Sequence, residues 1–101
     1  MKFRVIVRPE AEDDLKEAFS WYEDKRTGLG YYFLLQVDAG INFINRNLEI
    51  HPIEYKGTRK HVIKRFPYKI IYLLEEKKII ILAVIHGKRS PDLIKKRIDS
   101  I

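Results

Sequence analysis

The sequence contains no cysteine, which excludes disulfide bonds and thiolate metal sites and fits a reducing compartment. It also contains no apolar run that reaches the roughly 18 residues needed for a membrane-spanning helix. The longest such run, residues 79–85, has the length of a strand. Charges at Lys2 and Arg4 stand where the apolar region of a signal peptide would begin. We therefore expect a cytoplasmic protein that has no membrane partner.

The sequence is equally poor in features that would bind a metal or a cofactor. Its histidines, His51, His61 and His86, are scattered and give no ligand spacing. Gly28 and Gly30 lie close together, but they lack the strand-to-helix setting of a phosphate-binding loop. We expect neither a metal nor a cofactor.

What the sequence does contain is enough apolar material for a core, together with an uneven distribution of charge. Its 101 residues are 46% hydrophobic, which predicts a single domain over residues 1–101. The net charge of +6 divides into −2 for residues 1–50 and +8 for residues 51–101. Such a division predicts one surface that attracts an anion, which could be nucleic acid, the ribosome or an acidic protein segment. The plainer alternative is a set of solvated lysines.

The first half of the chain predicts a strand followed by two helices. Residues 3–7 alternate as a strand does. Pro9 and the acidic residues after it mark a helix start, and apolar residues at spacings of three and four continue that helix to about Lys25. A turn with two glycines over residues 26–30 leads into a second helix, whose apolar side runs to Leu48. The short connection predicts an antiparallel helical hairpin.

The second half predicts a three-stranded antiparallel meander and a short terminal helix. Runs rich in Val, Ile, Tyr and Phe cover residues 59–66, 68–75 and 79–86. Ser90 and Pro91 suit a helix start, and Ile94, Ile98 and Ile101 follow at helical spacing. Together the elements predict an α+β fold, in which the N-terminal strand and the meander form a small, mostly antiparallel sheet with the hairpin packed on one face.

Three short stretches stand out beside this order of elements. They are an acid-rich first helix at residues 11–15, Tyr-Lys-Ile-Ile-Tyr at residues 68–72, and Ile-His-Gly-Lys-Arg-Ser-Pro at residues 85–91. With the element order, they resemble the RelE/ParE superfamily of type II toxin–antitoxin toxins over nearly the whole chain. The resemblance implies a toxin neutralised by a small cognate antitoxin, whose C-terminal segment wraps the toxin in a toxin–antitoxin hetero-oligomer.

The superfamily has two branches with different targets. RelE-like members are mRNA endonucleases that act in the ribosomal A site, whereas ParE-like members poison DNA gyrase and lack nuclease chemistry. The RelE-like pattern has basic residues on the mRNA phosphates at the positions of Lys60, Lys69 and Arg89. It has a lysine that helps to activate the 2′-hydroxyl where this chain has Val62, and a C-terminal tyrosine near the place of Lys95.

The end of the chain departs from the RelE-like pattern. No tyrosine follows the last predicted strand, and His86 ends that strand as a histidine commonly does in the ParE-like branch. The resemblance therefore favours a ParE-like toxin that acts on DNA gyrase. Two alternatives stay open: a ribosome-dependent, metal-independent mRNA endonuclease, and an inactive relic that folds and binds an antitoxin.

Cleavage of RNA through the 2′-hydroxyl needs a general base, a general acid and positive charge at the phosphorane. His86 and Arg89 are the candidate catalytic residues if the chain is a nuclease; otherwise His86 positions the turn after its strand. His61, which we expect at the surface, would contribute only if it faced His86. Candidate residues for binding a substrate or partner are Arg59, Lys60, Lys64, Arg65, Lys69 and Lys88. An acidic antitoxin tail explains these charges as well as RNA does.

Overall fold

A computed structural model of the chain describes residues 3–100 and follows the predicted order of elements. The helices are α1 (Pro9–Lys25), α2 (Leu29–Arg46) and α3 (Pro91–Asp99), with one 3-10 turn, η1 (Tyr55–Gly57). The strands are β1 (Arg4–Val7), β2 (Arg59–Val62), β3 (Tyr68–Glu75) and β4 (Lys78–His86). The α+β class is confirmed, although Ile101 lies outside the described residues. Within residues 3–100, no helix has the length and apolar character needed to cross a membrane.

The strands form one mixed sheet in the order β1-β4-β3-β2. The predicted meander is confirmed, because β3 pairs antiparallel with both β2 and β4. The place of β1 was not predicted: it pairs in parallel with the first part of β4, from Arg4 opposite Lys78 to Val7 opposite Ile81. β4 is thereby an inner strand, which explains why it is buried without interruption from Ile81 to Ile85.

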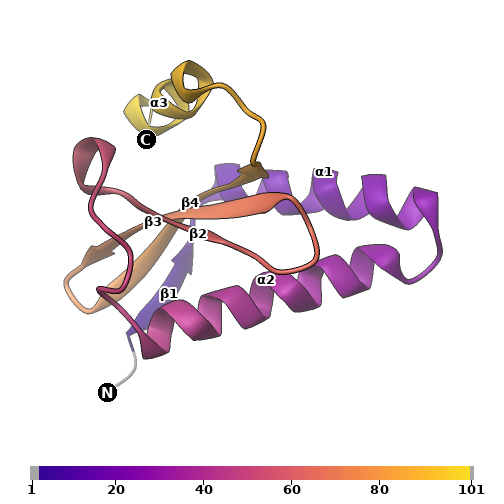
Figure 1. The fold of residues 1–101 in the computed structure, drawn as a ribbon, viewed down its shortest axis with the longest axis horizontal. Coiled ribbons are helices and arrows are strands. Elements are labelled where there is room, and N and C mark those ends of the chain that lie inside the picture. The colour runs from indigo at the N-terminus through magenta and orange to yellow at the C-terminus, as the bar shows by residue number, and fades with distance from the viewer. Residues whose placement is uncertain (1–2, 101) are drawn as a thin grey trace.

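Helices cover both faces of the sheet (Figure 1). The α1–α2 hairpin packs on one face, and the buried side chains there include Phe33, Val37, Ile44, Ile70, Tyr72 and Ile79. On the other face, α3 lays Ile94 and Ile98 against Ile71, Leu82 and Ile85. Because α3 is short, it covers only part of its face and leaves the β2 side of the sheet to solvent, where Val62 is 64% exposed.

The first strand of the meander is shorter than predicted. We expected a strand over residues 59–66, but β2 ends at Val62. Ile63 and Phe66 both turn inward to the hairpin core, and strict alternation cannot bury two residues three positions apart on one face. The chain therefore leaves the ladder, and Arg65 takes a left-handed backbone conformation with φ of 73°. Lys64 and Arg65 consequently lie in a turn and not on a strand.

The junction of the two long helices is held by a carboxylate. Glu23, near the end of α1, accepts hydrogen bonds from the backbone N–H groups of Gly28 and Gly30 at 2.8 and 2.9 Å. These N–H groups belong to the first turn of α2, where no helical partner is available. Gly30 also lets the helices approach: a Cβ there would lie 2.7 Å from the carbonyl oxygen of Phe19.

A second carboxylate joins three elements that are far apart in the sequence. Asp14 of α1 accepts two hydrogen bonds from the guanidinium of Arg97 in α3, at 2.7 and 2.8 Å. The same carboxylate accepts a third from the backbone N–H of Val84 in β4, at 3.0 Å. Both side chains are largely buried, with 12% of Asp14 and 24% of Arg97 exposed. This fork fixes α3 on the sheet.

Replacing Arg97 with Gln should lower the free energy of unfolding by about 1–3 kcal/mol, because Asp14 stays partly buried after losing its charged partner. Urea unfolding of both proteins measures the difference. Lys96→Gln is the matched control, since Lys96 is an exposed residue of the same helix and forms no ion pair among residues 3–100. An equal fall in stability for the two variants would contradict the role of the fork.

Replacing Gly30 with Ala should also destabilise the fold, by about 1–3 kcal/mol, because the new Cβ meets backbone and cannot be accommodated by a rotamer change. The substitution gains only about 1 kcal/mol of helix propensity. Asp38→Ala, at an exposed position of the same helix, is the control and should change stability little. If thermal or urea unfolding finds Gly30→Ala more stable than wild type, the close approach is wrong.

Candidate functional site

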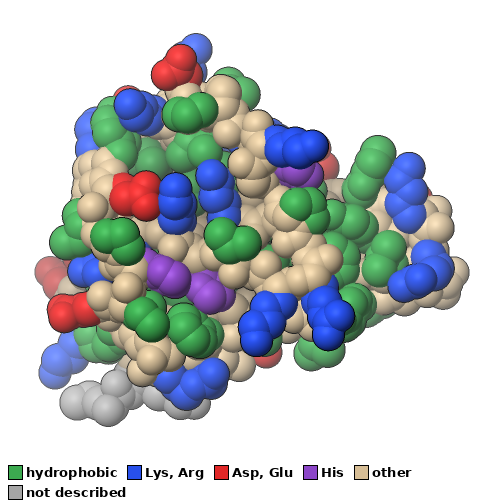
Figure 2. All heavy atoms as spheres, in the orientation of Figure 1, with side chains coloured by type: hydrophobic (Ala, Val, Ile, Leu, Met, Phe, Trp, Pro, Cys, Tyr) green, Lys and Arg blue, Asp and Glu red, His purple; other side chains and the backbone are tan. Residues whose placement is uncertain are grey.

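A basic groove lies on the α3 face, between α3, the segment before β2, and the first half of β3. Its volume is about 320 Å³. The polar and charged side chains that line it are Glu54, Tyr55, Thr58, Arg59, Lys60, Lys69, Arg89 and Lys95. Ile71, Ile94 and Ile98 give it an apolar floor. Figure 2 shows Lys and Arg side chains, in blue, near the middle of the molecular surface.

Four of the seven predicted basic residues meet in this groove. Arg59 and Lys60 come from β2, Lys69 from β3, and Arg89 from the turn after β4. They are brought together by sheet pairing and by a hydrogen bond from the N–H of Gly87 to the carbonyl of Pro67, at 2.7 Å. Lys64, Arg65 and Lys88 do not line the groove, because they lie in turns beyond the ends of the strands.

The groove keeps an excess of positive charge. Lys60 lies 3.5 Å from Glu54, and Arg59 donates to the backbone carbonyl of His51 at 2.6 Å. Lys69 and Arg89 form no ion pair among residues 3–100. A phosphate or carboxylate entering the groove would therefore find two cations without a competing carboxylate, which suits binding of an anionic chain.

Tyr55 is a groove residue that the sequence did not predict. Its hydroxyl donates to both carboxylate oxygens of Asp99, at 2.8 and 3.0 Å, and Lys56 lies 2.7 Å from the same carboxylate. The hydrogen bond to Asp99 raises the pKa of Tyr55. Lys95 lies 5.3 Å from the centre of its ring. Residues 49–57 show no periodicity, so no sequence pattern placed Tyr55 or Glu54 beside the basic residues.

His86 lies on the opposite face of the sheet from this groove. Its ring packs edge-on against Tyr68, with centroids 5.4 Å apart, and its Nδ1 accepts a hydrogen bond from the N–H of Lys88 at 3.0 Å. That bond fits the interpretation in which His86 positions the turn. His86 and Arg89 do line a common cavity, of about 460 Å³, between α1 and the end of β4. Neither Lys60 nor Lys69 reaches it.

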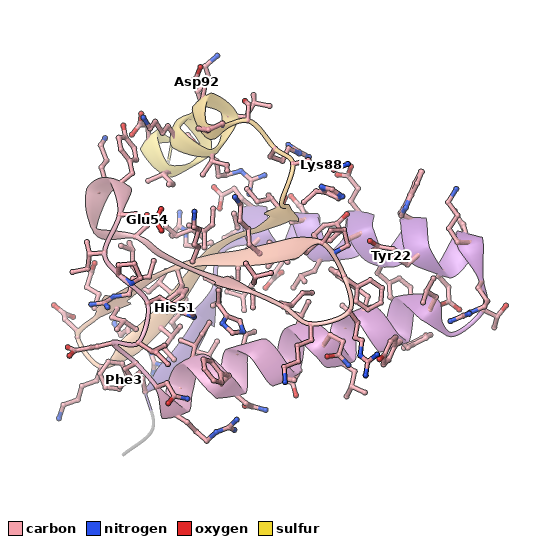
Figure 3. The ribbon with its side chains drawn as sticks, viewed as in Figure 1. Phe3, Tyr22, His51, Glu54, Lys88 and Asp92 are labelled. Carbon is pink, nitrogen blue, oxygen red and sulfur yellow. The ribbon has the colours of Figure 1, made fainter. Side chains whose placement is uncertain are left out.

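His61 does not face His86 but pairs with His51. The Nε2 of His51 lies 2.9 Å from the Nδ1 of His61, and the ring of His61 stacks on Phe43 of α2, 4.9 Å away. His51 and Glu54 lie at the opposite end of the sheet from Tyr22 and Lys88 (Figure 3). Burial lowers the pKa of His61, and the neighbouring His51 and Lys64 lower it further. The expected surface histidine is therefore half-buried and holds the loop before β2.

The lowered pKa of His61 should make stability depend on pH. Because the pKa of His61 is lowered in the folded chain, the unfolded chain takes up this proton first as pH falls below the ordinary value of 6.5. The free energy of unfolding should therefore fall between about pH 7.5 and pH 5.5. The fall should be at most about 1.4 kcal/mol for each unit by which folding lowers the pKa of His61. His61→Phe keeps the stacking on Phe43 and removes the titration. Urea unfolding at both pH values should show a smaller fall for the variant; an equal fall would contradict the prediction.

Residues 5–91 match the family model described as the ParE toxin of the type II toxin–antitoxin system parDE. The chain is 32% identical, over 97% of its length and 94% of the relative's, to Toxin ParE2 of Mycobacterium tuberculosis, in two strains.

Two solved structures share the fold. One is the chromosomal ParDE toxin–antitoxin system of P. aeruginosa, with a TM-score of 0.73, 17% identity, and coverage of 84% of this chain and 96% of that one. The other is the RelBE2 toxin–antitoxin complex of M. tuberculosis, with a TM-score of 0.57, 18% identity, and coverage of 85% and 92%. The family model spans most of the sequence and the relative spans nearly all of it, so the chain belongs to the ParE toxin family of type II toxin–antitoxin systems.

Proposed function

We propose that the chain is the toxin of a toxin–antitoxin pair, that a cognate antitoxin holds it inactive, and that it acts by binding DNA gyrase. The observation that carries the choice of target is the separation of the histidines from the basic groove. His86 opens on the hairpin face and His61 is paired with His51. The groove thus has cations to bind an anion but no imidazole to move a proton.

An antitoxin partner is supported by the relatives and by charge. Both solved neighbours are described as a toxin–antitoxin system or complex. The groove joins cations to an apolar floor of Ile71, Ile94 and Ile98. A segment that carries acidic and apolar residues in alternation is the complement of such a surface. This partner would cover Lys69 and Arg89, the groove cations that form no ion pair with any residue between 3 and 100.

A second candidate function, cleavage of mRNA, is favoured by one observation. Tyr55 supplies a phenol to the groove although no tyrosine follows β4. With Lys60 and Lys69 beside it, Tyr55 would serve as a general acid, since a phenol carries its proton at neutral pH. Its hydrogen bonds to Asp99 would have to break for the proton to reach a leaving group.

The first test uses purified gyrase, relaxed plasmid and ATP. The chain should block supercoiling and accumulate cleaved DNA, while transcripts in a translating extract stay intact. Tyr55→Phe should poison gyrase as wild type does, because the phenol has no part in this function. Addition of the cognate antitoxin should abolish the effect.

The same assays identify the second candidate. If transcripts are cut during translation and gyrase is unaffected, the gyrase proposal is wrong. Tyr55→Phe would then slow cleavage by about 10²–10⁴-fold, the contribution of one positioned general acid, and Lys69→Ala would weaken binding. Loss of cleavage in His86→Ala alone would instead point to the histidine on the other face. A folded chain inert in both assays would be the inactive relic.

A further inference from the structure

The cavity on the hairpin face is formed by the part of α1 that extends past the sheet (Figure 1). Asp14 lies over β4 and accepts the N–H of Val84. Glu17, Trp21 and Asp24 follow at spacings of three, four and three residues, so they share one side of α1. All line the cavity of about 460 Å³, opposite the end of β4. If this side of the helix packed on a core, its residues would be apolar. Instead, Glu17 and Asp24 carry carboxylates and Trp21 carries an indole ring.

The walls of this cavity combine carboxylates with aromatic rings. Asp14 is neutralised by Arg97, but Glu17 and Asp24 are exposed and form no ion pair among residues 3–100. Trp21 lies between them with 57% of its surface exposed. Tyr22 and Tyr68 complete the aromatic lining. Carboxylates flanking an aromatic face are the surroundings that a guanidinium prefers, since it can form fork-like hydrogen bonds and stack at once.

Two basic side chains of this chain, Lys25 and Arg89, already lie at the cavity. The ammonium of Lys25 lies 4.1 Å from the centre of the Trp21 ring, so the indole face attracts a cation in the free protein. Burial raises the pKa of Tyr68, while Glu17 raises it and Arg89 lowers it. Arg89, which also lines the cavity, and Lys25 together balance the two carboxylates of Glu17 and Asp24. An arriving guanidinium would therefore take the place of the Lys25 ammonium at the indole face, and the other acidic residues of α1 would supply the net attraction.

We propose that this cavity receives an arginine side chain presented by a partner protein. A protein segment fits better than a free metabolite because the attraction extends beyond the cavity: α1 carries seven acidic residues and two basic ones between Pro9 and Lys25. A basic segment would be drawn to the whole helix, and one arginine would enter beside Trp21. This site lies on the opposite face of the sheet from the basic groove, shares only Arg89 with its lining, and does not depend on whether the target is gyrase or mRNA.

Trp21 reports on the site directly, because it is the only tryptophan in the sequence. We would titrate the full chain with a capped Ala-Arg-Ala tripeptide and follow indole fluorescence. A saturable change is expected. The tripeptide in which citrulline replaces arginine keeps the shape without the charge and should bind at least about tenfold more weakly, the factor that one lost charge-assisted hydrogen bond produces. Equal binding of the citrulline peptide would overturn the proposal.

Two variants and one control locate the binding. Glu17→Gln and Asp24→Asn should each weaken arginine-peptide binding by about tenfold while leaving the urea midpoint unchanged, since both carboxylates are exposed. Glu12→Gln removes a carboxylate of the same helix that does not line the cavity, and should bind as wild type does. Unchanged binding in both cavity variants would overturn the site. Free L-arginine binding more tightly than the tripeptide would overturn the partner protein as its source.

Discussion

The carboxylate of Asp14 is the contact on which the arrangement of this molecule depends. β1 ends at Val7, opposite Ile81, while β4 continues to His86. Beyond Ile81 the outer edge of β4 would expose an unpaired N–H, and Asp14 satisfies that of Val84. The carboxylate can do so as an anion because Arg97 reaches it from α3. One side chain thus closes the sheet edge and holds the helix that covers the second face.

The two candidate surfaces depend on this arrangement in different ways. α3 forms a wall of the basic groove, and it is tied by Arg97 to α1 and by Asp99 to Tyr55 and Lys56. The cavity beside Trp21 is lined at one end by Asp14 and Val84, the two residues that join α1 to β4. Arg89 lines both, since the turn after β4 lies at the rim of the sheet between its faces. A partner that engages both surfaces would carry opposite charges along its chain.

Local patterns were sufficient to predict the elements but not how they meet. Pro9 and the glycines near residue 28 marked the helices because backbone chemistry acts over a few residues. The bidentate pair of Asp14 and Arg97 joins residues 83 apart, and nothing in the sequence near either one indicates the other. The parallel pairing of β1 with β4 and the position of Tyr55 in the groove also depend on contacts between segments far apart in the sequence. Lys60, Lys69 and Arg89 come together through sheet pairing, which the pattern did predict.

The distribution of acid–base and cationic groups over the two faces is what supports the proposal that this chain acts by binding and not by catalysis. Proton transfer needs an acid or base within hydrogen-bond reach of the anion that the cations hold. Here the cations of the groove lie on one face, and His86 lies on the other, bonded to the N–H of Lys88. Tyr55 is in the groove, but Asp99 occupies its hydroxyl. A surface that offers charge and shape, and whose phenol is already hydrogen-bonded, is suited to holding another macromolecule, as the proposed function requires.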